Sequence, residues 1–130
     1  MIRGIHHVSL RCDDPDLFTK AAEFYCDVLK LKVARQWDRG IMIDTGNGLI
    51  EVFNNQHGDF IKGAVAHFAL ASDNVDADIE RVRQAGYSIT REPRDIVIRS
   101  EIPFPARMAF CIGPLGEEIE IFQEKTESRG

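Results

Sequence analysis

Hydrophobic and polar residues alternate along residues 5–12, as they do in a strand that buries one face. Asp14 can cap a helix directly after this segment, and Pro15 suits the first turn of that helix. Apolar residues then recur at helical spacing over residues 16–30. A turn signal, Gly46-Asn47-Gly48, joins the last two of three strand-like segments. These segments cover residues 32–36, 40–45 and 49–53.

The same order of elements starts again after a polar, turn-rich linker over residues 54–63. Residues 64–71 alternate, and Ser72-Asp73-Asn74 offers caps for a helix that should end at Gly86. Strand-like segments follow at residues 87–91, 107–112 and 117–123. The pattern therefore predicts two similar modules, at about residues 4–56 and 64–124.

Direct comparison of the halves supports an internal duplication. HHVSLRCDD and AHFALASDN stand at the same place in each half, and so do LIEVFN and EIEIFQ. The chain is expected to be one domain over residues 1–130, of α+β class, with two tandem βαβββ modules. The second module is longer by a segment around residues 94–106. Because Pro103 and Pro105 lie there, a stiff loop is predicted in preference to a central strand.

Composition narrows the classes of function. The chain has 130 residues and a net charge of −5, which argues against a nucleic-acid surface. No apolar run approaches the length of a membrane span, and residues 1–9 have no apolar stretch of signal-peptide type. Three cysteines without a CxxC pair indicate reduced thiols, buried or half-buried. We therefore expect a cytoplasmic protein without membrane or nucleic-acid partners.

Each half carries a histidine early in its first strand and a glutamate in its last strand. These residues are His7 and Glu51 in the first half, and His67 and Glu120 in the second. All four lie on the polar face of a strand whose other face is aliphatic. In a duplicated fold equivalent positions can converge, and two imidazoles with two carboxylates suit Zn²⁺, Ni²⁺, Co²⁺ or Mn²⁺. His67 aligns with His7, whereas Ala66 takes the place of His6. His7 is therefore the expected ligand, and His6 should face the aliphatic side with a structural role.

The repeated H-x-x-L, the Phe24-Tyr25 pair and the I-E-[VIL] strand endings resemble the vicinal oxygen chelate superfamily, over about residues 5–124. Within it the chain is most similar to the glyoxalase I (lactoylglutathione lyase) family, whose ligand order His-Glu-His-Glu maps onto the four residues above. The resemblance implies curved sheets that form a metal cleft, one divalent ion, and a homodimer acting on a small molecule.

The resemblance also implies an activity in methylglyoxal detoxification. A hemithioacetal of methylglyoxal with glutathione, or with another low-molecular-weight thiol, would be isomerised to a 2-hydroxyacyl thioester through an enediolate. Glu120 is the expected general base, and Glu51 could serve the other stereoisomer. Arg11 and Asn55 match positions that contact the thiol cosubstrate, and Phe53 and Phe122 could form walls of the cleft.

Two other functions remain open from the sequence. A methylmalonyl-CoA epimerase uses the same proton abstraction but typically carries Gln where this chain has Glu51. An antibiotic-binding dimer would lack the ligands. The chain also departs from typical glyoxalase I, because residues 102–105 read IPFP in place of a glycine-rich segment that contains a lysine. Arg99 or Arg107 could take the place of that lysine. The usual acidic D-P-x-G turn is G-P-L-G here, at residues 113–116.

Overall fold

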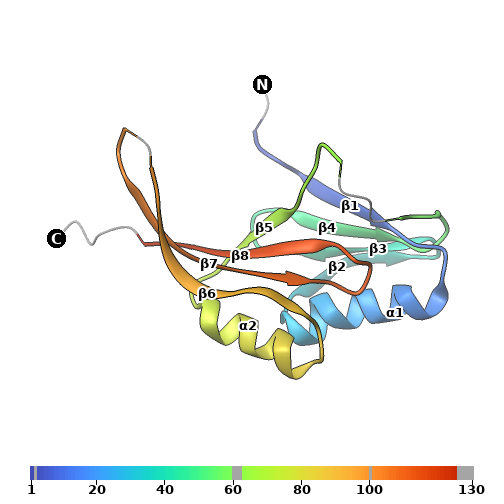
Figure 1. Cartoon of the computed structure of the whole chain (residues 1–130). Helices are drawn as coiled ribbons and strands as arrows, with labels where there is room; N and C mark the ends of the chain where they lie inside the picture. Colours follow the sequence, from blue (N-terminus) through green and yellow to red (C-terminus); the bar gives the residue numbers. More distant parts are fainter. Residues whose placement is uncertain (2, 60–62, 100, 126–130) are drawn as a thin grey trace. The chain divides into compact units, whose positions relative to one another are not determined.

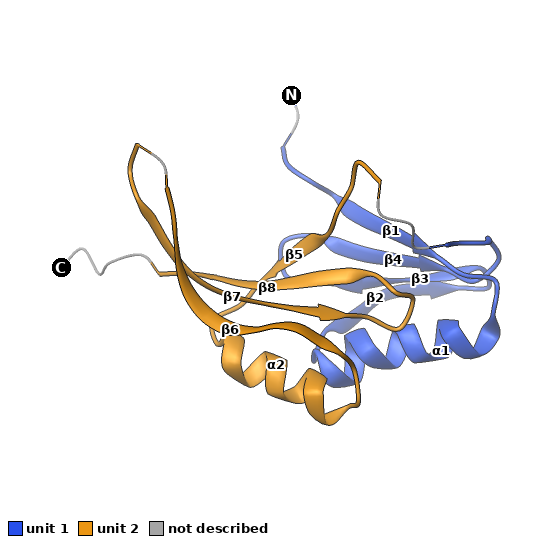
Figure 2. Cartoon of the chain, in the orientation of Figure 1, with its two compact units in different colours: residues 1–61 blue, residues 62–130 orange. Residues whose placement is uncertain are grey.

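The structure is a computed structural model, which describes residues 1, 3–59, 63–99 and 101–125. The chain divides into two compact units, residues 1–61 and 62–130, coloured separately in Figure 2. Each unit holds one mixed four-stranded sheet with helical structure between its first two strands. The predicted α+β fold of two tandem βαβββ modules is therefore confirmed. In the described part of the chain, no helix is long and apolar enough to cross a membrane.

The first unit has the strand order β1-β4-β3-β2, and its helix α1 contacts β4 (Figure 1). β1 runs parallel to β4, and the remaining neighbours are antiparallel. A π-helical segment, η1, follows α1 directly. The bounds are β1 His7–Arg11, α1 Pro15–Glu23, η1 Phe24–Val28, β2 Lys32–Trp37, β3 Gly40–Asp44 and β4 Leu49–Phe53.

The second unit repeats this topology, with the order β5-β8-β7-β6 and a parallel β5–β8 pair. Its helix α2 contacts β6, β7 and β8. The bounds are β5 Phe68–Ala71, α2 Val75–Gln84, β6 Ile89–Ile98, β7 Phe104–Ile112 and β8 Glu118–Glu124. Because the same strand order arises twice, the two halves are related in structure as well as in sequence.

The predicted helix boundaries follow from local chemistry. The Asp14 side chain accepts hydrogen bonds from the backbone N–H groups of Asp16 (2.8 Å) and Leu17 (3.4 Å). Asn74 caps α2 in the same way, accepting from Ala77 N at 3.1 Å. Gly86 follows the end of α2 with φ +93°, a conformation that glycine adopts without steric cost. The caps and the C-terminal glycine were thus predicted correctly.

Alternation along the strands separates a buried aliphatic face from a polar face. In β4, for example, Ile50 and Val52 are fully buried on either side of Glu51. No disulfide joins the three cysteines, all of which are described: Cys12 and Cys111 are buried and Cys26 is half-buried. Burial raises the pKa of the Cys111 thiol to about 12, which keeps it protonated and unreactive.

Residues 94–98 and 104–106 belong to two paired strands, so the stiff loop predicted there in preference to a strand is wrong. β6 continues to Ile98 and β7 begins at Phe104, with Val97 opposite Pro105. Pro105 is tolerated because its carbonyl faces β8, where it accepts from Lys125 N at 2.9 Å. In an antiparallel strand the N–H and C=O of one residue point the same way, so the missing N–H also lies on that side. The pairing with β6 loses nothing.

The turn at residues 113–116 lacks the usual aspartate, and the carboxylate of Glu117 accepts a hydrogen bond from it instead. Glu117 is fully buried, and its Oε1 accepts from Leu115 N at 2.8 Å. A Cβ atom at position 113 would overlap this carboxylate. Gly113 and Glu117 therefore complement each other, and the absence of an aspartate at position 113 leaves the turn with an acceptor.

Candidate functional site

The polar face of the first sheet carries most of the expected site residues of that unit. His7, Ser9 and Arg11 alternate along β1 with the aliphatic Val8 and Leu10. Ser9 lies directly opposite Glu51 of β4 in the parallel register, so His7 is two residues before the position that faces this glutamate. The distance from His7 Nε2 to Glu51 Oε1 is 3.7 Å.

The second sheet repeats the arrangement. Ala69 of β5 lies opposite Glu120 of β8, and His67 again stands two residues before the opposing position. His67 Nε2 lies 3.3 Å from Glu120 Oε1. The His67 ring meets the edge of Phe110, with ring centroids 5.0 Å apart. Each unit therefore brings its own histidine and glutamate together by the same register.

The spacing of each pair can be compared with that of two ligands of one metal ion. Two ligand atoms about 2.1 Å from one ion, at an angle of about 90–110°, are roughly 3.0–3.4 Å from each other. The His67–Glu120 distance of 3.3 Å lies within this range, and the His7–Glu51 distance of 3.7 Å lies just above it. The glutamate side chains are only 10% and 14% exposed, so their carboxylates require a cation or donors. Within the described residues, no group of three or more potential ligands comes together, and the expected ligands are found as two separate pairs.

His6, expected to have a structural role, is an exposed neighbour of His7. Its Nδ1 lies 3.0 Å from Nδ1 of His7, and the two rings pack edge to face at 5.2 Å. Because β1 begins only at His7, strand alternation does not fix the direction of His6. The His6 ring contacts the histidine that is the expected ligand. In the sequence, the contact could have been suspected from the position of two adjacent histidines at the start of a strand.

Arg11 and Asn55 lie near the same end of the first sheet. Arg11 ends β1 and is opposite Phe53, on the face that carries His7. Asn55 is an exposed residue in the turn after β4, and the next residue, Gln56, donates its N–H to Cys12 O at 3.2 Å. Phe53 packs edge-on against Trp37 at 6.0 Å.

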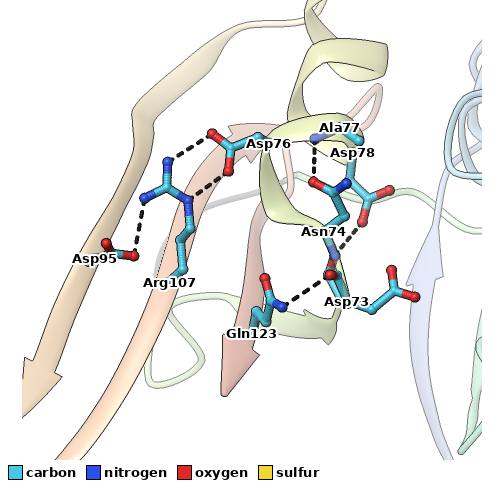
Figure 3. Close-up of polar contacts among 9 residues, drawn as sticks. Asp73, Asn74, Asp76, Ala77, Asp78, Asp95, Arg107 and Gln123 are labelled. Carbon is cyan, nitrogen blue, oxygen red and sulfur yellow. Dashed lines mark hydrogen bonds and ion pairs between the residues drawn. The ribbon is translucent and has the colours of Figure 1, made fainter. Parts of the chain in front are cut away.

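Arg107, one of two residues suggested as a substitute for a lysine expected from the resemblance, does not lie on the face that carries Glu120. It lies opposite Gln123 of β8. Because side chains alternate along a strand, Gln123 and Glu120, three residues apart, point to opposite faces of the sheet. Its guanidinium donates to Asp76 of α2 at 2.6 and 2.8 Å and to Asp95 of β6 at 3.1 Å (Figure 3). Asp76 and then Asp95 raise the pKa of Arg107, and Arg107 lowers that of Asp76. This network binds α2 to the β6–β7 pair.

Two cations that sequence reasoning missed, Arg91 and Arg94, lie on the face of the second sheet that carries Glu120; Arg94 pairs with Met108, which pairs with Phe122. Arg91 pairs with Phe110, and Phe110 pairs with Glu120, so the three share one row across the strands. The guanidinium carbon of Arg91 lies 5.2 Å from the Phe110 ring centroid, a cation–π distance. On the same face Phe122 stacks on Phe104 at 6.2 Å.

Comparison with known proteins agrees with this architecture. The family profile of the glyoxalase/bleomycin resistance protein/dioxygenase superfamily matches residues 4–121. The chain is 29% identical over 136 residues to a lactoylglutathione lyase of Escherichia coli O157:H7, covering 95% of each protein. It is also similar to the crystal structure of the trypanothione-dependent glyoxalase I of Leishmania major. That comparison gives a TM-score of 0.70 and 25% identity, over 96% of this chain and 89% of the other. The chain therefore belongs to the glyoxalase/bleomycin resistance protein/dioxygenase superfamily.

Proposed function

We propose that this protein is a metal-dependent lyase of the glyoxalase I type, which isomerises a thiol hemithioacetal of methylglyoxal to a 2-hydroxyacyl thioester. The observation that carries the proposal is the pair of matched His–Glu contacts, 3.7 Å in one unit and 3.3 Å in the other. Membership of the superfamily and the lactoylglutathione lyases among its relatives support the same reaction.

The four side chains would serve as ligands of one divalent ion. His7 and His67 offer ring nitrogens, and Glu51 and Glu120 offer sheltered carboxylate oxygens, a mixed set suited to Ni²⁺, Zn²⁺, Co²⁺ or Mn²⁺. When bound, such an ion supplies Lewis-acid stabilisation for the negative charge of an enediolate. The contact between His6 and His7 fits this role, because a ligating histidine commonly donates its second ring N–H to a neighbour.

Proton transfer is assigned to Glu120. Its carboxylate is 14% exposed and accepts no backbone hydrogen bond among those of the described residues, so it can take a proton from one substrate carbon and return it to the next. Glu51 holds the equivalent position in the first unit and would serve the other stereoisomer. The stacked Phe104 and Phe122 present an apolar surface beside Glu120 on the same face, which favours exclusion of water.

The thiol cosubstrate carries carboxylates if it is glutathione, and cationic or amide side chains would bind them. Arg11 and Asn55 are proposed contacts in the first unit. Arg91 is added in the second unit, because it lies on the face of Glu120 and its guanidinium contacts the neutral ring of Phe110. Glutathione and another low-molecular-weight thiol are both compatible with these residues. The assembly is proposed to be a homodimer.

The test is to load metal-free protein with Ni²⁺ or Zn²⁺ and measure turnover of methylglyoxal with several thiols. Glu120→Gln should keep the fold and lower kcat by about 10²–10⁴, the usual contribution of a general base. Glu124→Gln, a change in an exposed glutamate at the end of the same strand, is the matched control and should keep full activity. Full activity of Glu120→Gln would refute the assignment of the base.

A metal-binding protein without turnover on any thiol hemithioacetal would contradict the proposed reaction. Epimerisation of a 2-substituted acyl-CoA would then be assayed next, since it uses the same proton abstraction. A protein that binds no metal under these conditions would favour the small-molecule (antibiotic) binding dimer instead.

A further inference from the structure

Residues 54–59, which we call the strap, lie against the end of β1 in the first sheet. They follow β4, and because β1 and β4 are parallel the two strands end at the same edge of the sheet (Figure 1). At the start of the strap, Asn54 N donates to Arg39 O at 2.9 Å, and Gln56 N donates to Cys12 O at 3.2 Å. The first half of the strap is therefore held by backbone hydrogen bonds.

The second half of the strap packs directly on Arg11, the last residue of β1. A Cβ atom at Gly58 would lie 2.5 Å from the Arg11 carbonyl oxygen and 2.9 Å from Arg11 Cγ. A glycine is needed where two segments of backbone approach each other this closely. Asn55 lies in the same strap, so the position of the strap sets the position of Asn55 and limits the conformations of the Arg11 side chain.

His57 joins the strap to the segment between β1 and α1. Its Nδ1 lies 3.3 Å from Asp13 Oδ2, and its Nε2 lies 3.2 Å from Asp59 Oδ2. Asp59 belongs to the strap itself, whereas Asp13 comes two residues after Arg11, the residue on which the strap packs. The contact between His57 and Asp13 is therefore a side-chain tie between the strap and the end of β1.

Only the protonated form of His57 satisfies both contacts. An ionised carboxylate accepts hydrogen bonds but donates none, and a neutral imidazole carries one N–H and one lone pair. The neutral ring therefore leaves one aspartate facing a lone pair, whereas the imidazolium donates to both. Asp59 and Asp13 are the charged groups that act on His57, and their hydrogen bonds raise its pKa above the ordinary 6.5. The tie is thus complete at mildly acidic pH and loses its charge as the pH rises through the folded pKa.

We propose that His57 is a pH-sensitive clamp, whose charged ring holds the strap against the end of β1 and thereby positions Arg11 and Asn55. When the ring loses its proton, the remaining N–H serves Asp59, two residues away, and the tie to Asp13 is lost, so that the strap opens. The effect on the thiol cosubstrate rests on the function proposed above, whereas the clamp itself does not. His57 is a positioning residue, because it acts through the strap.

The clamp is tested first without substrate, by hydrogen exchange of the Gln56 amide in ¹⁵N-labelled protein. Its protection, corrected for the intrinsic exchange rate at each pH, should fall up to about fivefold between about pH 6 and about pH 9, the most that an exposed ion pair contributes. Asp13→Asn should remove this pH dependence, and Asp59→Asn should move its midpoint to lower pH. Asp16→Asn, at an exposed aspartate in the first turn of α1, is the matched control and should behave as the wild type.

The positioning role is tested by the KM for the hemithioacetal of methylglyoxal and glutathione in the metal-loaded enzyme. The quantity compared is the ratio of KM in His57→Gln to KM in the wild type, because ionisation of the thiol and of the proposed metal ligands affects both proteins equally. This ratio should be about three- to fivefold at about pH 6 and approach unity at about pH 9, while kcat stays the same in the two proteins.

The outcomes separate the clamp from the reaction. Protection of the Gln56 amide that does not change with pH, or that changes equally in the wild type and in Asp13→Asn, overturns the clamp whether or not the hemithioacetal is turned over. A KM ratio that is constant with pH overturns the positioning role. If no hemithioacetal is turned over, the proposed reaction fails, and positioning is read from the side-chain N–H signals of Arg11 and Asn55. These signals should titrate with the midpoint of the strap, and signals that do not move overturn the positioning role.

Discussion

Replacement of His6 tests whether the residue next to His7, the proposed ligand, influences metal binding. His6 Nδ1 and His7 Nδ1 are 3.0 Å apart, so one of these nitrogens carries the proton that the other accepts. If His7 donates, its Nε2 keeps a lone pair directed toward Glu51 and ready for a metal. In His6→Ala this tautomer loses its partner, and the His7 ring loses its edge-to-face contact.

The magnitude follows from the exposure of the contact. A neutral hydrogen bond contributes about 1 kcal/mol net, which corresponds to roughly fivefold in a binding constant. Loss of an outer partner of a ligating histidine typically costs 10–100-fold. Because the His6–His7 contact is exposed, the low end applies, and His6→Ala should weaken Zn²⁺ binding about five- to tenfold. His6→Asn retains an acceptor and should recover part of this loss.

The assay is titration of metal-free protein with Zn²⁺ in competition with a chromophoric chelator, accompanied by ¹⁵N NMR of the imidazole nitrogens. His57→Ala is the control, because His57 is an exposed histidine of the same unit that contacts Asp13 and Asp59 instead of a ligand. An unchanged affinity and an unchanged His7 tautomer in His6→Ala would refute the reasoning. So would an equal loss of affinity in His57→Ala.

Two further predictions concern stability. Gly113→Ala should lower the free energy of unfolding by about 1–3 kcal/mol, because the new Cβ overlaps the buried Glu117 carboxylate; in a Glu117→Ala background most of this cost should disappear. Additive losses in urea denaturation would contradict this coupling. Hydrogen bonds to Asp59 and Asp13 raise the pKa of His57 above its ordinary 6.5, so the protonated histidine stabilises the folded chain. That stabilisation is complete below pH 6.5 and disappears as the pH rises through the folded pKa, so the melting temperatures of wild type and His57→Gln should converge toward alkaline pH. A constant difference would argue against the linkage.

Local patterns were sufficient to predict the elements of the fold and the residues of the two His–Glu pairs. Alternation, helix caps and turn residues depend on neighbours within a few positions, so the strands around Glu51 and Glu120 and the caps Asp14 and Asn74 were predicted from sequence. Because the sequence is duplicated, each position of the first half could be compared with its equivalent in the second half. This comparison distinguished His7 from His6 as the residue on the polar face of the strand.

Tertiary structure decided which side chains meet across strands and beyond strand ends. The role of Arg107 depends on whether it shares a face with Glu120 or with Asp76, and a register shift of one residue reverses that choice. Pro105 fits a paired strand only because its carbonyl side faces the end of β8. The sequence by itself thus determined the modules and their polar faces, since both follow from local periodicity. The contacts of His6, Arg91 and Glu117 were decided only by strand register and packing, because their partners follow no local period.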